Sequence, residues 1–137
     1  FIAEDTFNFI HFSIDAFSKE SYEIVKGKDR REIAYQNILR FLKLRTKLGY
    51  KRPFASMGFV IQPDNAHEAN DFLSFWSKQL PPNSFTVDHD WQQENCDSIY
   101  FRRLNTGDQK SSDALHEKTL MQLGFSKSEL LRGEESF

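Results

Sequence analysis

Residues 7–16 read FNFIHFSIDA, and this segment predicts the first strand of the fold. Its apolar side chains follow one another almost without a break, at Phe9, Ile10, Phe12 and Ile14. A nearly continuous apolar strand is typical of a parallel sheet that is buried on both faces. We therefore expect both faces of this strand to be covered, with His11 and Ser13 as its polar interruptions.

The residues that follow predict two helices. Ser18 is expected to cap a short helix that ends near Gly27. A longer helix is expected from Asp29, because Asp29 and Glu32 form a capping-box pattern before an apolar stripe that recurs every three to four residues. Gly49 is the residue type that typically follows a helix, so we expect this helix to end there.

The rest of the chain continues the alternation of strands and helices. Further strands are predicted at residues 53–62, 84–88 and 98–104. Asn65 with Glu68 repeats the N-cap pattern and begins the next helix, and a last helix is predicted at 113–123, followed by a capped turn at 126–129. Strands that alternate with helices of this length predict right-handed βαβ units, and therefore an α/β fold with a parallel sheet.

The composition excludes several classes of function. The 137 residues carry 18 basic and 20 acidic side chains, so the chain lacks the basic character of a nucleic-acid-binding protein. No apolar run approaches the roughly 18 residues that cross a bilayer, so we expect no membrane association. Cys96 is the only cysteine, which excludes an internal disulfide framework and a cysteine metal cluster. We expect a reducing, cytoplasmic location.

Ligands of parallel sheets bind at the carboxyl ends of the strands. The residues at those ends are Ser13, Asp15, Gln62, Asp64, Asp88, His89 and Asp90. Ser13 and Asp15 are two positions apart on a strand and therefore share one face. They either receive the hydroxyl or amino groups of a nucleotide or sugar, or Asp15 caps the following helix, and the spacing leaves both interpretations open.

The other chemical groups give weaker signals. Asp88-His89-Asp90 has metal-ligand side chains, but neighbours on a strand point to opposite faces, so a polar strand-to-loop junction is the simpler interpretation. No nucleophile elbow or phosphate-binding glycine loop is present, so we assign no catalytic residue and no metal ligand. The basic cluster at Lys26, Lys28, Arg30 and Arg31 is either a solvated face or an anion site.

The order of several short motifs resembles the middle of radical S-adenosylmethionine enzymes, and most closely the members with a cysteine-rich extension for auxiliary iron–sulfur clusters. The motifs are IHFSIDA at 10–16, then Ser18, Tyr22, Ile24, Asn37-Ile38, Phe41-Leu42 and Asn65-Ala66-His67-Glu68. The resemblance covers residues 7–88. It implies a βαβαβ parallel-sheet fragment of a partial (β/α) barrel in residues 1–90. Additional C-terminal helices in an extension, residues 91–137, would pack on the same domain.

The resemblance also implies a cofactor site. Ser13 and Asp15 are similar to residues that contact the ribose and methionyl groups of S-adenosylmethionine, and Ile61 and Gln62 would line its adenosine side. The family often places an arginine that faces the cofactor carboxylate at the position of Lys26. Lysine keeps the charge of that arginine but lacks its bidentate fork.

One departure from the family affects activity. The family holds its [4Fe–4S] cluster with a C-x-x-x-C-x-x-C motif, whereas this sequence has Cys96 alone. Three thiolates are needed for such a cluster, so the chain alone is expected to hold no cluster, to bind the cofactor weakly or not at all, and to be inactive. We expect a fragment of a parent enzyme that cleaves S-adenosylmethionine reductively and starts radical chemistry on a peptide or small molecule. A relative that has lost catalysis is the other interpretation.

Two hypotheses from other classes remain. A non-catalytic α/β binding or interaction module would use the 14 phenylalanines to build a sufficient core. A small metal-dependent hydrolase would use Asp15, Asp88, His89 and Asp90, and ranks last. In the fragment hypothesis the first strand has an open edge, through which we expect the chain to self-associate.

Overall fold

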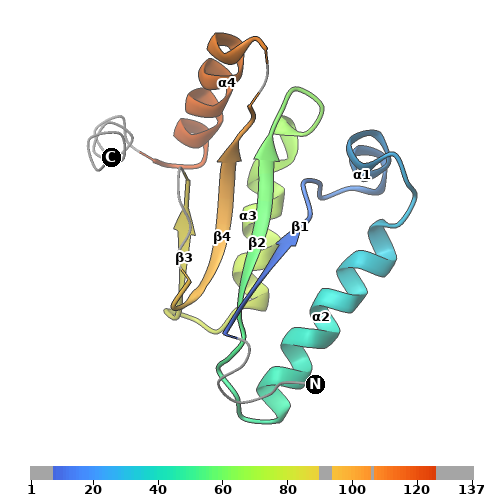
Figure 1. Ribbon diagram of the computed structural model, residues 1–137, viewed down its shortest axis with the longest axis vertical. Coiled ribbons are helices and arrows are strands. Elements are labelled where there is room, and N and C mark those ends of the chain that lie inside the picture. The colour runs from blue at the N-terminus through green and yellow to red at the C-terminus, as the bar shows by residue number, and fades with distance from the viewer. Residues whose placement is uncertain (1–7, 90–93, 106, 126–137) are drawn as a thin grey trace.

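The computed structural model describes residues 8–89, 94–105 and 107–125, and the structural statements below refer to these residues. Its elements are β1 (Phe9–Ser13), α1 (Lys19–Lys26), α2 (Arg31–Lys47), β2 (Phe54–Ile61), the 3-10 turn η1 (Ala66–Glu68), α3 (Ala69–Gln79), β3 (Phe85–Asp88), β4 (Asp97–Arg103) and α4 (Gln109–Gln122). The predicted alternation of strands and helices is therefore confirmed (Figure 1). The turn predicted at 126–129 lies outside the described residues.

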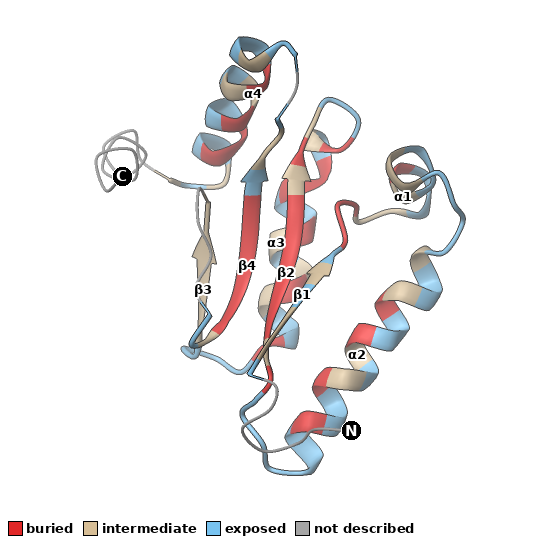
Figure 2. Ribbon diagram, in the orientation of Figure 1, coloured by how far each residue is buried: buried red, intermediate tan, exposed pale blue. Residues whose placement is uncertain are grey.

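The four strands form one parallel sheet in the order β1-β2-β4-β3. The α/β class and the parallel sheet are thus as predicted, and the sheet is open rather than closed into a barrel. The order along the sheet differs from the order along the chain, because β4 lies between β2 and β3. A strand from the segment predicted as an extension therefore occupies a central position, and β2 and β4 are the most deeply buried strands (Figure 2).

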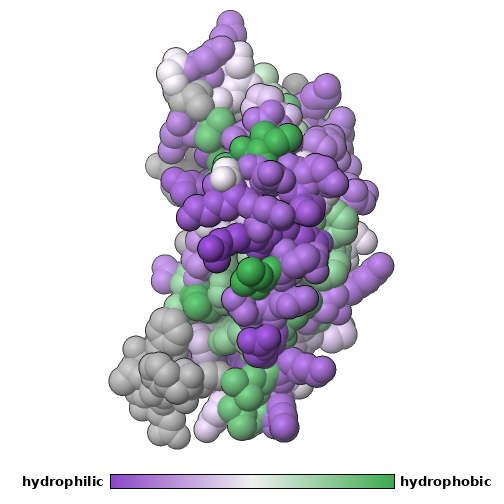
Figure 3. Space-filling model, turned by 90° about the vertical axis from the view of Figure 1, so that its right-hand side faces the viewer, coloured by the Kyte–Doolittle hydropathy of each residue, from purple (hydrophilic) through white to green (hydrophobic). Residues whose placement is uncertain are grey.

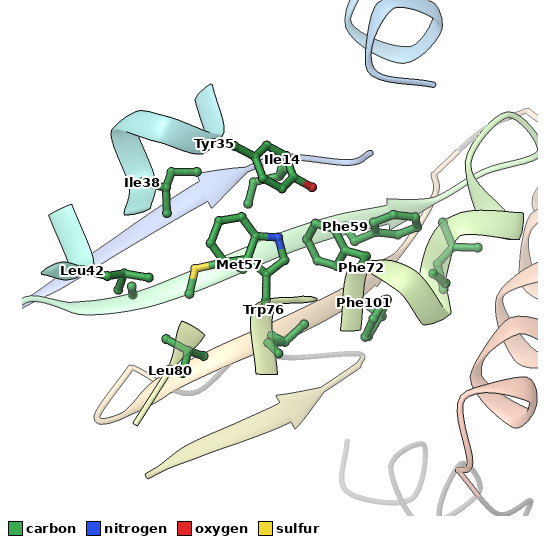
Figure 4. Close-up of a cluster of buried hydrophobic side chains, with 14 of the residues drawn as sticks. Ile14, Tyr35, Ile38, Leu42, Met57, Phe59, Phe72, Trp76, Leu80 and Phe101 are labelled. Atoms are coloured by element: carbon green, nitrogen blue, oxygen red, sulfur yellow. The ribbon is translucent and has the colours of Figure 1, made fainter. Parts of the chain in front are cut away.

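The apolar core lies between the sheet and helices α2 and α3. Alternate residues of β2, including Met57 and Phe59, point to this side and are fully buried. Trp76 of α3 is at the centre of the cluster, with its ring centroid 5.0 Å from that of Tyr35 in α2 (Figure 4). Fully burying a side chain of this size contributes about 1.5–3 kcal/mol, so this cluster fixes both helices on the same face of the sheet.

Among the described residues, helices α2 and α3 lie on one face of the sheet. In Figure 1, α3 lies behind the sheet and α4 beyond the carboxyl end of β4, while no helix among the described residues lies in front of the strands. The prediction that β1 is covered on both faces is therefore wrong, since His11 and Ser13 are exposed. The physical reason is that β1 is an edge strand and that α2 and α3 pack on one side.

The outer surface of α1 and α2 carries isolated apolar side chains. The exposed large apolar residues of this region are Ile24, Ile33, Leu44, Leu48 and Tyr50. Figure 3 shows apolar patches separated by hydrophilic side chains on this side of the molecule, which is ordinary for a protein surface. Within the described part of the chain, no helix has the length and apolar character needed to cross a membrane.

The helix boundaries confirm some predicted caps and correct others. Ser18 caps α1 as predicted, because its hydroxyl accepts a hydrogen bond from Ser21 N at 3.2 Å. The capping box predicted at Asp29 is wrong. Helix α2 begins one residue later with Arg30 as an N-cap that makes no side-chain bond, and the Asp29 carboxylate instead pairs with Lys19 at 3.4 Å.

Candidate functional site

The chain turns sharply at the carboxyl end of β1. The backbone N–H groups of Ile14 and Asp15 both donate to the carbonyl oxygen of Gly58, each at 3.1 Å. Asp15 takes up a left-handed conformation, with φ at 63°, which is uncommon outside glycine but tolerated by aspartate. The turn directs the Asp15 side chain back across the sheet toward β2.

Ser13, Asp15 and Lys26 meet at this turn, and we call them the β1-end cluster. One Asp15 carboxylate oxygen, Oδ1, accepts a hydrogen bond from Val60 N at 2.7 Å. The other, Oδ2, accepts from Lys26 Nζ at 2.8 Å and from Ser13 Oγ at 3.0 Å. Lys26 Nζ also donates to Ser13 Oγ at 3.1 Å, so the three polar groups form a closed triangle.

Lys26 is placed by the fixed position of helix α1. The carboxylate of Glu68 accepts from Phe17 N at 2.9 Å and from Ser18 N at 3.1 Å, immediately before the helix begins. Burial acts to raise the pKa of Glu68, but the hydrogen bonds from Ser18 and Phe17 outweigh it and hold the pKa below its usual value. Glu68 is therefore charged at neutral pH, and it anchors the start of the helix whose last residue is Lys26.

Asn65 holds the same turn in place through hydrogen bonds to the backbone. Its side chain is fully buried, and its amide nitrogen donates to the carbonyl oxygens of Asp15 and Val60, both at 2.8 Å. Its amide oxygen accepts from Gln62 N at 2.9 Å. The predicted side-chain cap at Asn65 is therefore wrong, since its amide joins the ends of β1 and β2 instead.

The five residues implied as cofactor contacts thus have different surroundings. Ser13, Asp15 and Lys26 are in direct contact, and Gln62, half-buried at the end of β2, is tied to them through Asn65. Ile61 is fully buried in the apolar core. The roles of Asn65 and Glu68 as braces were missed, because asparagine and glutamate at this spacing equally predict a helix start.

The residues considered for metal binding do not converge. Asp88 ends β3, at the opposite edge of the sheet from Asp15, and three strand spacings separate them by roughly 14 Å. The ring of His89 packs edge-on against Phe125 at 5.0 Å, and Asp90 lies outside the described residues. Among the residues that the structure describes, no three His, Cys, Asp or Glu side chains are grouped as metal ligands would be.

The residues of the predicted basic cluster have three different surroundings. Lys26 belongs to the β1-end cluster, whereas the Arg31 guanidinium donates to Phe17 O at 2.7 Å and lies 3.7 Å above the ring of Tyr35. Burial raises the pKa of the Tyr35 phenol, whose hydroxyl donates to the carbonyl oxygen of Ala16. Arg31 is thus a packing element of the core, while Lys28 and Arg30 are exposed.

The β1-end cluster offers a cation, a carboxylate and a hydroxyl within hydrogen-bond distance of one another. These group types are suited to hydrogen bonding with an anion and with hydroxyl groups, and the cluster lies at the strand ends where parallel sheets generally bind ligands. Comparisons of the chain with models of protein families, with curated proteins and with solved structures gave no match.

Proposed function

We propose that this chain is the carboxyl-side part of a partial barrel in a radical S-adenosylmethionine enzyme, and that the β1-end cluster is part of its cofactor site. The observation that carries the proposal is the convergence of motifs that are far apart in the sequence. Ser13 and Asp15 meet Lys26 directly, and the Asn65-x-x-Glu68 motif, about 50 residues away, supports both the turn and the helix that place them.

The groups present suit parts of S-adenosylmethionine. A carboxylate and a hydroxyl, as in Asp15 and Ser13, are suitable partners for the ribose hydroxyls, and the Lys26 ammonium is a suitable partner for the methionyl carboxylate. Gln62 lies at the end of the neighbouring strand, next to the same turn. Ile61 is fully buried in the core, so we propose that it fixes the position of this strand end by packing in the core.

The groups present do not suit the iron–sulfur cluster. The only cysteine, Cys96, directly precedes β4. It therefore lies at the amino ends of the strands, whereas the β1-end cluster lies at their carboxyl ends. Its sulfur is 3.8 Å from the Thr86 hydroxyl. We propose that another part of the parent enzyme holds the cluster. There, cluster and cofactor together would supply the reductive cleavage that starts radical chemistry on a peptide or small molecule.

The position of β1 at the edge of the described sheet supports the same proposal. Within the described residues β1 pairs with β2 and is the edge strand of the sheet. In a partial barrel the preceding strand would occupy this edge. In the chain alone the same edge would favour self-association.

An NMR titration of the ¹⁵N-labelled chain with S-adenosylhomocysteine, a stable relative of the cofactor, tests the proposal. We expect shifts of the amide signals of Ser13, Asp15, Lys26 and Gln62, with a dissociation constant on the order of 1 mM because much of the site is absent. The amides near Asp97, at the amino end of β4 and thus at the other end of the strands, are the internal control. Tight binding by the chain alone, or shifts confined to other regions, would contradict the proposal and favour a self-contained binding module.

The gene provides an independent test. We expect the reading frame before the codon for Phe1 to encode a C-x-x-x-C-x-x-C motif. A frame without that motif would contradict the assignment to a radical enzyme.

A further inference from the structure

We infer that Lys26 is a latch on the β1-end cluster: an anionic group of the ligand draws Lys26 away and so frees Asp15 Oδ2 and Ser13 for ligand hydroxyls. This inference rests on the proposed function, because it concerns the same site. It adds that the site favours binding of an anion together with hydroxyl groups, as in one molecule that carries both.

Three donors already engage the Asp15 carboxylate. Asp15 Oδ1 is held by Val60 N, and Oδ2 receives both Lys26 and Ser13. The Ser13 hydroxyl donates to Asp15 and accepts from Lys26. A ligand hydroxyl therefore finds the best acceptor, Asp15 Oδ2, engaged by two donors.

Of these groups, Lys26 is the one best placed to move. Asp15 is fixed by its left-handed backbone, by the bond to Val60 N and by Asn65, which binds its carbonyl oxygen. Lys26 has a long flexible side chain at the last residue of α1, and its side chain is 25% exposed against 9% for Asp15. Opening of the site therefore means rotation of Lys26 toward solvent.

Displacement of Lys26 from Asp15 favours ligands that carry an anion. An anion that binds Lys26 replaces the ion pair that is lost, and at the same time it releases Asp15 Oδ2 and Ser13 for hydroxyls. A neutral nucleoside must break the ion pair without a replacement and binds weakly. The anion and the hydroxyls therefore bind cooperatively, as linkage requires of two groups that favour the same open state.

Binding measurements on the 137-residue chain and its variants test the latch. Adenosine has the hydroxyls alone, S-adenosylhomocysteine adds a carboxylate, and adenosine monophosphate adds a phosphate. Lys26→Met should tighten adenosine binding about fivefold, the range expected for loss of a partly exposed ion pair, and weaken S-adenosylhomocysteine binding severalfold. Lys28→Met, which changes a neighbouring exposed lysine, should alter neither.

A second measurement needs no variant. Acetate added to the wild-type chain supplies the anion separately, so adenosine should bind severalfold more tightly in acetate than in chloride at equal ionic strength. Lys26→Arg, which keeps the charge, should retain the weak binding of adenosine. These two measurements also apply if Lys26→Met fails to fold.

The outcomes separate the latch from the proposed function. If S-adenosylhomocysteine binds at the cluster but neither Lys26→Met nor acetate changes adenosine affinity, the latch is wrong and the proposed function stands. If adenosine monophosphate binds as the homocysteine compound does, and both lose their advantage over adenosine in Lys26→Met, the latch is supported for nucleotides in general. If no ligand shifts the cluster signals in any variant, both proposals fail.

Discussion

Replacement of Asp97 by asparagine should be among the most destabilising single changes in this protein. Asp97 begins β4, and its carboxylate forms a bidentate pair with Arg45 of α2, with both N–O distances at 2.8 Å. The same carboxylate accepts from Ala55 N in β2, also at 2.8 Å. The side chains of Arg45 and Asp97 are only 3% and 6% exposed, so neither charge can be hydrated if the other is removed.

The expected loss follows from that burial. Breaking a buried ion pair by removing one charge costs about 3–5 kcal/mol, and Asp97→Asn should be near 3 because asparagine keeps one acceptor oxygen. With a urea dependence of roughly 2 kcal/mol per molar for a domain of this size, the midpoint of urea unfolding should fall by about 1.5 M. The slope of the transition should remain unchanged, because the surface exposed on unfolding is the same.

Asp29→Asn is the matched control. Asp29 pairs with Lys19 at 3.4 Å, and the two side chains are 56% and 59% exposed, so its loss should change stability by less than about 0.5 kcal/mol. The double variant Arg45→Met/Asp97→Leu should recover part of the loss, since it leaves no unpaired charge but removes the acceptor of the buried Ala55 N–H. Equal urea midpoints for Asp97→Asn and Asp29→Asn would refute the reasoning.

Two further predictions concern Glu68 and Gly58. The pKa of Glu68 is lowered by folding, so its contribution to stability is present above the unfolded-state pKa near 4.5 and is lost as pH falls through the folded-state value. Glu68→Gln should therefore lower the free energy of unfolding by about 1–2 kcal/mol at pH 7. In urea unfolding at lower pH, the difference in free energy of unfolding between wild type and variant should become smaller. A difference that does not change with pH would count against this. A Cβ atom at Gly58 would lie 2.5 Å from His11 Cε1 and 3.3 Å from Phe12 O, so Gly58→Ala should cost about 1 kcal/mol in thermal or urea unfolding. The cost should shrink in a His11→Ala background, and an undiminished cost there would show that His11 is not the obstacle.

The local structure of this protein was predictable from sequence patterns. The apolar run from Phe9 to Ile14 and the stripe of α2 gave strands and helices within a few residues of their observed bounds, because burial on one face imposes a regular spacing. Caps were less predictable. Asp29 and Asn65 have the residue types of N-caps, but their side chains found partners that the local sequence does not reveal, in Lys19 and in the ends of β1 and β2.

The order of the strands and the braces of the site could not be predicted. Both depend on contacts between residues about 40 to 50 positions apart, such as Asp97 with Ala55 and Glu68 with Phe17. Neither the hydrophobicity of a side chain nor the residues next to it in the sequence indicate which distant residue it contacts. Ser13 and Asp15 were identified because they end a strand, but their contact with Lys26 depends on how α1 folds back over that end.

The insertion of β4 between β2 and β3 has a consequence for how the protein is made. On the ribosome, β3 emerges before β4, yet its only sheet neighbour among the described residues is β4. Strand β3, with Phe85 and Val87, therefore has no neighbouring strand to pair with until translation has passed Arg103. A chain terminated between these two strands would lose not one strand from the sheet but two.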